Sequence, residues 1–227
     1  MKSRALYRID QVAAKRLEGF RCGDPNLDQF LAEYAIAYSL AGLTQTFIMI
    51  EPDCEVPVAY FSLSTDGMPL DFVERNRLSL AFDCSLSFFP SIKITKFAVR
   101  EDLQSNGIGT DLIDTIGGLA HTPNVSARLL TVDAASNPRT IAFYERNGFR
   151  TSRRHADRAT MRNSRNRSAQ GDSRTVHMFR DLYDPEEAHP LASRWPQPLK
   201  VEDRLPAGWS SRPTRPLTTR TPSSVWQ

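Results

Sequence analysis

The chain of 227 residues is poor in cysteine and has no long apolar run, and these scarcities exclude several classes of protein. Its three cysteines, Cys22, Cys54 and Cys84, are odd in number and widely spaced, so they match neither a disulfide framework nor a zinc-ligand pattern. No stretch approaches the roughly 18 consecutive apolar residues that a membrane-spanning helix needs. The N-terminal sequence MKSRALYRIDQV lacks the apolar core of a secretory signal. We therefore expect a cytoplasmic protein without a membrane segment or a metal site.

Positive charge is concentrated in one part of the chain. Hydrophobic residues make up 40% and charged residues 24% of the sequence, which are ordinary values for a globular protein. The formal net charge is only +3, yet residues 1–149 have an excess of four acidic side chains and residues 150–175 an excess of six basic ones. The positive charge is therefore local to this short segment.

A helix is predicted to begin within the sequence CGDPNLDQFLAEYAIAYSL. Asp24 is a residue type that caps free helix amides, and Pro25 suits the first helical position. Apolar side chains then recur at helical spacing on one face. They are Leu27, Phe30, Leu31, Tyr34 and Tyr38. The pattern predicts an amphipathic helix that packs this stripe against a core.

Strand and helix patterns alternate over the rest of residues 1–183. Runs rich in β-branched and aromatic residues predict strands at 44–51, 56–65, 91–100, 127–135 and 175–182. Helices are predicted at 69–82, after residue 107, and at 137–149. The interleaving predicts one mixed α/β domain over residues 1–183, with a basic insertion at about 153–175 before the last strand.

Residues 184–227 differ in composition from the rest of the chain. They hold eight of the fifteen prolines and all three tryptophans, Trp195, Trp209 and Trp226. Proline at this density is incompatible with a continuous helix or a central strand. We predict an extended or disordered tail, of which the tryptophan-bearing parts dock on a surface.

Two glycines stand between a predicted strand and a predicted helix in the sequence LQSNGIGTDLI. A dinucleotide fingerprint needs a third glycine where Leu112 stands, and the Gly-Lys-Ser/Thr of a P-loop is missing. Free amides at a helix N-terminus favour an anion, and glycines let the backbone approach it. Taken alone, the two glycines favour a plain strand-to-helix turn, and a phosphate or pyrophosphate site is the alternative.

The sequences VREDLQSNGIGTDLI and LLTVDAASNPRTIAFYERNGF together resemble the GNAT family of N-acetyltransferases. The acyl-CoA loop of that family has the pattern Gln/Arg-x-x-Gly-x-Gly/Ala, which Gln104, Gly107 and Gly109 meet. The resemblance implies a GNAT-like α/β fold, in which a central, mostly antiparallel sheet with flanking helices is splayed at the acyl-CoA site. It also implies acetyl-CoA as the acetyl donor.

The resemblance assigns the donor site residue by residue. Backbone amides of residues 104–110 would hold the pyrophosphate, and the strand segment KFAV would offer backbone groups of Phe97 and Val99 to the pantetheine and the thioester. Asn137 reads as a helix cap and as a contact to CoA. The implied donor-binding residues are Phe97, Ala98, Val99, Gln104, Ser105, Asn106, Gly107, Ile108, Gly109, Thr110 and Asn137.

Tyr144 is the implied catalytic acid. An amine attacks the thioester directly, and the leaving thiolate needs a proton, which a phenol with an ordinary pKa near 10 still holds at neutral pH. Without the resemblance, Tyr144 reads as a helix residue that packs its ring on the sheet. None of the four histidines lies in a motif, so no general base is identified.

The stretch FRCGDPNLDQFL resembles the opening of the GNAT toxins of bacterial toxin-antitoxin pairs. The matching residues are Phe20, Cys22, Gly23, Leu27, Asp28, Phe30 and Leu31. The resemblance implies acetylation of the α-amine of aminoacyl-tRNA and a ribbon-helix-helix antitoxin as partner. An ordinary first helix is the alternative, and the sequence leaves open whether the protein forms a homodimer.

The arginine-rich segment supports an RNA acceptor on physical grounds, because arginines neutralise phosphates with release of counterions. The segment lacks aromatic residues for base stacking and is expected to contact backbone only. The predicted nucleic-acid contacts are Arg153, Arg154, Arg158, Arg162, Arg165 and Arg167. A solvated loop is the alternative. An acetyltransferase for a small amine or a protein amine, and a catalytically idle nucleic-acid-binding module, are the competing functions.

Overall fold

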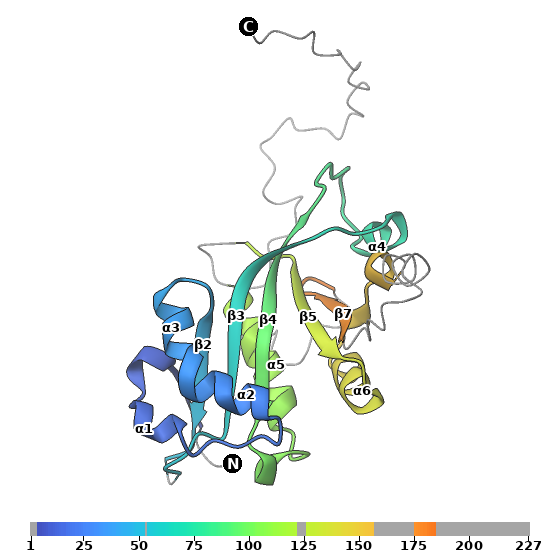
Figure 1. The fold of residues 1–227 in the computed structure, drawn as a ribbon. Helices are drawn as coiled ribbons and strands as arrows, with labels where there is room; N and C mark the ends of the chain where they lie inside the picture. Colours follow the sequence, from blue (N-terminus) through green and yellow to red (C-terminus); the bar gives the residue numbers. More distant parts are fainter. Residues whose placement is uncertain (1–3, 53, 122–125, 157–174, 185–227) are drawn as a thin grey trace, which may run out of the picture.

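The computed structural model describes residues 4–52, 54–121, 126–156 and 175–184 (Figure 1). Its centre is a seven-stranded sheet in the order β1-β2-β3-β4-β5-β7-β6. The strands are β1 Ala5–Arg8, β2 Gln45–Ile50, β3 Ala59–Met68, β4 Phe89–Val99, β5 Leu129–Ala135, β6 Arg150–Thr151 and β7 Thr175–Asp181. Every neighbouring pair is antiparallel except β4 and β5. The predicted mixed α/β class with a mostly antiparallel sheet is confirmed.

Helices cover both faces of this sheet. They are α1 Ala14–Leu17, α2 Pro25–Gln29, α3 Ala35–Leu40, α4 Phe72–Arg77, α5 Ile108–Ala120 and α6 Pro138–Arg146. Alternation along the strands separates two cores. On one face Ile48, Tyr60 and Ala98 pack with the helices of the N-terminal part, and on the other Phe61 and Val132 pack with α5 and with residues of α6. In the described parts of the chain, no helix has the length and apolarity that crossing a bilayer requires.

The first predicted helix is correct at its start and wrong in its second half. Asp24 accepts a hydrogen bond from the amide of Asn26, and Pro25 opens α2. A π-helical turn, Phe30–Tyr34, then separates α2 from α3. This wider turn shifts the following side chains around the axis. As a result Ala35 is fully buried, whereas the predicted core residue Tyr34 is 46% exposed.

The strands β4 and β5 separate partway along their length. Their parallel pairing runs from Ser91 and Leu129 to Ile94 and Val132 and stops there. Beyond that point a register shift opposite Ser62 and Leu63 leaves Thr95 unpaired as a bulge in β4. The continuation of β5 pairs with β7 alone. The sheet is thus splayed, as the resemblance implied.

Two predicted regions fall mostly outside the described residues. Of the basic insertion, the structure describes residues 153–156 and 175, and of the proline-rich tail it describes only Asp184. The domain boundaries at 183 and 184 therefore stay predictions. The short strands β1 and β6 were not predicted, because four and two residues carry too little alternation to be recognised.

Candidate active site

A pocket of about 630 Å³ lies where β4 and β5 part. Its walls come from the start of α2, the end of β4, the turn into α5, and α6. All of the residues predicted for the donor site and for catalysis line it, except Asn106 and Ile108. Asn106 is exposed beside the pocket, and Ile108 is buried in the core under α5. The residues that the sequence predicted thus lie together around one pocket, and their roles stay a prediction.

The end of β4 directs backbone groups into the gap between β4 and β5. The amide of Arg100 donates to the carbonyl of Val58 at 2.9 Å, which makes residues 58 and 100 a hydrogen-bonded pair of the β3–β4 ladder. Since backbone groups alternate in direction along a strand, those of Phe97 and Val99 point away from β3. On that side β5 has already diverged. Phe97 and Val99 thus offer the groups that the resemblance assigned to donor binding.

The start of α5 is shaped by two glycines with different tasks. Gly107 is the N-cap in the left-handed region, with φ of 81°, and a Cβ there would meet nothing within 4 Å, so the space beside it is open. A Cβ at Gly109 would lie 3.0 Å from the ring of Phe143. No side chain caps this helix, so its first amides, at the positive end of the helix dipole, are of the kind that favour an anion.

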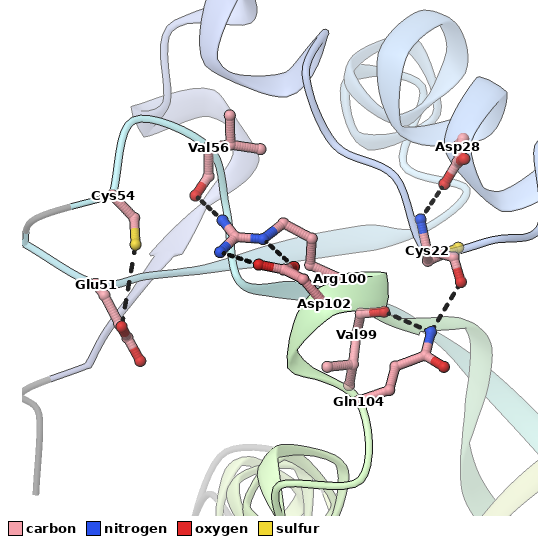
Figure 2. Close-up of polar contacts among 9 residues, drawn as sticks. All are labelled: Cys22, Asp28, Glu51, Cys54, Val56, Val99, Arg100, Asp102 and Gln104. Atoms are coloured by element: carbon pink, nitrogen blue, oxygen red, sulfur yellow. Dashed lines mark hydrogen bonds and ion pairs between the residues drawn. The ribbon is translucent and has the colours of Figure 1, made fainter.

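Gln104 joins the two sides of the pocket mouth (Figure 2). Its side-chain amide donates to the carbonyl of Val99 at 3.1 Å and to the carbonyl of Cys22 at 2.8 Å. The amide of Cys22 in turn donates to Asp28 at 2.8 Å. The first residue of the predicted acyl-CoA loop therefore also fixes the segment that opens the toxin-like motif.

Tyr144 is buried beneath the pocket with 5% of its surface exposed. Its ring is held by edge-on contacts to Phe143 and Phe149, at centroid distances of 5.1 and 5.2 Å, and by Phe97 at 6.3 Å. Burial raises the pKa of the Tyr144 phenol well above its ordinary value. Among the described residues its hydroxyl has no hydrogen-bond partner, so its proton remains available to a group in the pocket.

Asn137 has the capping role that the sequence predicted. Its side chain accepts a hydrogen bond from the amide of Thr140 at 2.9 Å and so begins α6. The residue also lines the pocket, next to Arg139, whose guanidinium lies 3.4 Å from the Ser105 hydroxyl. Asn137 thereby sets the direction of the helix that holds Tyr144.

Several residues of the pocket wall were not predicted as site residues. They are Cys22, Asp24, Leu27, Leu103, Arg139, Thr140, Phe143 and Arg146. The first three belong to the toxin-like opening, which the sequence connected with the acceptor but not with the pocket. The positive charge of Arg139 and Arg146 on α6 was a usable signal, because α6 follows β5 at the site where the sheet opens.

The predicted arginine contacts are described only at their beginning. Arg153 is exposed, but its guanidinium lies 3.4 Å from the Asp71 carboxylate and its amide donates to Glu74 at 2.8 Å. Arg154 is half-buried. The remaining four, Arg158, Arg162, Arg165 and Arg167, lie outside the described residues. Their role in binding nucleic acid stays a prediction.

Comparison with known proteins agrees with this geometry. Residues 72–151 match the family model of the acetyltransferase (GNAT) domain. No curated protein sequence matches the chain. Among solved structures, a bacterial toxin is similar with a TM-score of 0.57 at 15% identity, covering 80% of this chain and 92% of that one.

Two further structures show the same fold. AtaT complexed with acetyl-methionyl-tRNAfMet has a TM-score of 0.57 at 16% identity, covering 81% of this chain and 98% of its own. A tyrosine-to-phenylalanine mutant of KacT has a TM-score of 0.57 at 16% identity, covering 83% of this chain and 100% of its own. At such identities the likeness shows the fold. Residues 72–151 therefore carry a GNAT acetyltransferase domain, for which acetyl-CoA is the acetyl donor, and the fold is shared with solved bacterial toxins.

Proposed function

We propose that this protein acetylates the α-amine of aminoacyl-tRNA by direct attack of that amine on the thioester of acetyl-CoA. One observation carries the donor half of the proposal: a single pocket combines the open backbone of β4, the uncapped start of α5 and the buried hydroxyl of Tyr144. In this order they supply a strand edge for the pantetheine arm, an anion site and a protonated acid, which are the parts that thioester cleavage needs.

Each part of the pocket has a chemical task in this proposal. The amides at the start of α5 hold the pyrophosphate, with Arg139 beside them as a further positive charge. The backbone groups of Phe97 and the amide of Val99 hold the pantetheine arm, and their N–H groups stabilise the oxyanion; the carbonyl of Val99 already accepts a hydrogen bond from Gln104. Tyr144 gives its proton to the sulfur as the carbon–sulfur bond breaks. The raised pKa of Tyr144 keeps that proton in place until the thiolate forms.

The toxin-like opening supports the acceptor half. Its residues Cys22, Asp24 and Leu27 form one side of the pocket mouth, which we call the lip. The carbonyl of Leu27 accepts a hydrogen bond from the buried hydroxyl of Tyr60 at 2.8 Å, so the lip is fixed to β3. AtaT, which shares the fold, was solved with acetyl-methionyl-tRNAfMet. An acceptor that enters past the lip meets the thioester from the side opposite α5.

Two partners belong to the proposal. Arginines of the segment 153–167 contact the tRNA backbone. A small antitoxin of the ribbon-helix-helix type neutralises the enzyme, as is suggested by AtaT, which was solved bound to the C-terminus of the antitoxin AtaR. We expect a short reading frame that encodes such an antitoxin to lie next to the gene of this protein.

The test is mass spectrometry of amino acids released from charged tRNA after incubation with the protein and acetyl-CoA. We expect N-acetylated amino acids with the unmodified protein and a strongly reduced yield with Tyr144→Phe. Acetyl-CoA binding without any modified aminoacyl end would contradict the RNA acceptor.

A small amine or a protein amine is the second candidate acceptor. It is favoured by the position of Arg153, since Asp71 and Glu74 already engage this first arginine of the basic segment. This candidate predicts acetylation in the absence of RNA and no loss of rate when the arginines are replaced. Assaying free amines, a lysine-rich protein and charged tRNA in parallel separates the two functions.

A further inference from the structure

A cluster of titratable side chains lies on the strands beside the pocket. The carboxylate of Asp133, on β5, accepts a hydrogen bond from Nδ1 of His177 at 2.7 Å through one oxygen. Its other oxygen lies 2.6 Å from Nζ of Lys93 on β4. The ring of His155 stands against that of His177, with a centroid distance of 4.1 Å. None of these residues lines the pocket described above.

The position of the cluster is fixed by the sheet. Asp133 is the first residue of β5 beyond Val132, at which the pairing with β4 ends. Val132 and Ala134 pack in the core that also contains α5 and Tyr144. Because side chains alternate along a strand, Asp133 points to the opposite face. The cluster thus stands at the apex of the splay, on the same face as the lip.

His177 is oriented as a base. A carboxylate only accepts hydrogen bonds, so Nδ1 of His177 is the donor and the neutral ring has its lone pair on Nε2. His177 and Lys93 together hold the pKa of Asp133 well below its ordinary range, which keeps the carboxylate charged. In the described structure Nε2 has neither a hydrogen-bond partner nor complete burial, and the side chain is 11% exposed.

The charges around His177 are balanced. Asp133 on the neighbouring strand stabilises the imidazolium, and Lys93 on β4 opposes it. His155 faces the ring from the other side, and its Nδ1 lies 3.2 Å from the Ser152 hydroxyl. On the same face Asp66 of β3 accepts a hydrogen bond from Thr131 at 2.7 Å, and Lys96 lies over the Phe30 ring.

We propose that His177 is the general base for acetyl transfer and that Asp133 positions it; this rests on the proposed function. The nitrogen of the neutral acceptor amine bonds to the carbonyl carbon, and the carbon–sulfur bond breaks. Sulfur takes the proton of Tyr144, and the proton lost by nitrogen passes through a water molecule to Nε2 of His177, which lies outside the pocket. The imidazolium then releases a proton to water and the phenolate regains one, which leaves the N-acetylated amine and CoA thiol.

The experiment compares kcat/KM across pH for the full chain and three variants, with charged tRNA as acceptor. His177→Asn keeps an N–H group for Asp133 but has no basic nitrogen. Asp133→Asn removes the negative charge. His121→Asn is the matched control, because His121 binds the carbonyl of Gly117 at the end of α5, away from the cluster.

We expect His177→Asn to lower kcat/KM at pH 7 by about 10²-fold. At low pH the logarithm of the unmodified rate should fall by two per pH unit, since both imidazole and amine must be neutral, and that of the variant by one. Asp133→Asn should cost less, because it removes the charge that positions the ring but leaves the basic nitrogen in place. His121→Asn should behave like the unmodified protein.

Acetyl-CoA affinity and the melting temperature separate a base from a structural residue. Both should be unchanged in His177→Asn. A variant that keeps the unmodified rate and its two-proton dependence would overturn the assignment, and so would a loss of rate that follows a loss of acetyl-CoA binding. If the unmodified protein fails to acetylate charged tRNA, the proposed function itself is contradicted, which is a distinct result.

Discussion

Tyr144 combines a fixed ring with a hydroxyl that has no partner in the described structure. Removing only that oxygen, as Tyr144→Phe, should lower kcat by about 10²-fold or more, because the leaving thiolate loses its proton donor while the ring contacts remain. Single-turnover kinetics with saturating acetyl-CoA measures this. Tyr7→Phe is the matched control, because it removes a phenol hydroxyl on β1 that does not line the pocket. A similar fall in both variants would argue against Tyr144 as the acid.

The raised pKa of Tyr144 also has a consequence for stability. A phenol whose pKa is higher in the folded than in the unfolded protein contributes stability that is complete below the unfolded value, near pH 10, and is lost as the pH rises above it. Urea unfolding between pH 8 and pH 11 should therefore show a decline in stability above pH 10 that is smaller in Tyr144→Phe. Equal declines would show that this phenol is not desolvated.

Cys22 lines the pocket but is not suited to be a nucleophile. Burial raises the pKa of its thiol to about 12, so the reactive thiolate is scarce at neutral pH. Direct transfer therefore predicts that Cys22→Ser retains acetylation and that no acetyl group is found on Cys22 when the protein is mixed with acetyl-CoA alone. Intact-mass measurement checks both points, and an acetylated protein that chases into product would contradict direct attack.

At this scale the sequence named residues that the structure gathers around one pocket, and it named no base. The residues of the predicted acyl-CoA loop and Tyr144 could be named because their motif is continuous in sequence. His177 and Asp133 are 44 positions apart and meet only through the pairing of β5 with β7. No local pattern marks such a pair, so the four histidines looked equivalent.

The start of α5 depends on glycine for a packing reason that can be tested. In Gly109→Ala the new methyl group would press on Phe143, which lines the pocket, so we expect acetyl-CoA affinity to fall by about tenfold. Gly117→Ala on the same helix is the matched control, because a Cβ there meets nothing within 4 Å. That change should leave affinity unchanged and add about 0.5–1 kcal/mol of stability. Calorimetric titration with acetyl-CoA and thermal unfolding measure both.

Elements with regularly spaced apolar residues or a helix-capping residue could be predicted from the sequence. Elements whose shape depends on tertiary contacts could not. The capped helix starts at Asp24 and Asn137 and the strands from β2 to β5 follow their sequence patterns. The π-helical turn does not, because a regular 3.6-residue period was assumed across it. Because of this turn Ala35, and not Tyr34, lies in the core. Only the packing of the helix against β2 and β3 determines where such a turn forms.

For the whole molecule, the charge distribution makes a prediction about RNA. Replacing Arg158, Arg162, Arg165 and Arg167 together by glutamine should weaken tRNA binding at low salt and reduce the slope of log affinity against log salt by about 3. Acetyl-CoA affinity should not change. Filter binding at several potassium chloride concentrations measures the slope. An unchanged slope would exclude these arginines from the RNA contact and favour the small-amine acceptor.

The layered mixed α/β arrangement was foreseeable, since strands and helices alternate along the chain, but the assembly of the pocket was not. Its two sides are brought together by Gln104 and Cys22, which are 82 positions apart. The side proposed to hold the donor lies within residues 72–151, the part that matches the GNAT domain model, and the lip lies outside it.

This division lets the two halves of the reaction diverge separately during evolution. On the proposed function, a substitution in the lip would alter which amine enters and leave the proposed donor site, built from β4, α5 and α6, intact. Descendants of one ancestral enzyme can thus exchange acceptors and keep their donor. Grafting a foreign lip between Phe20 and Phe30, with Asp28 retained to hold it, is the corresponding route by which such an enzyme would be redirected in the laboratory.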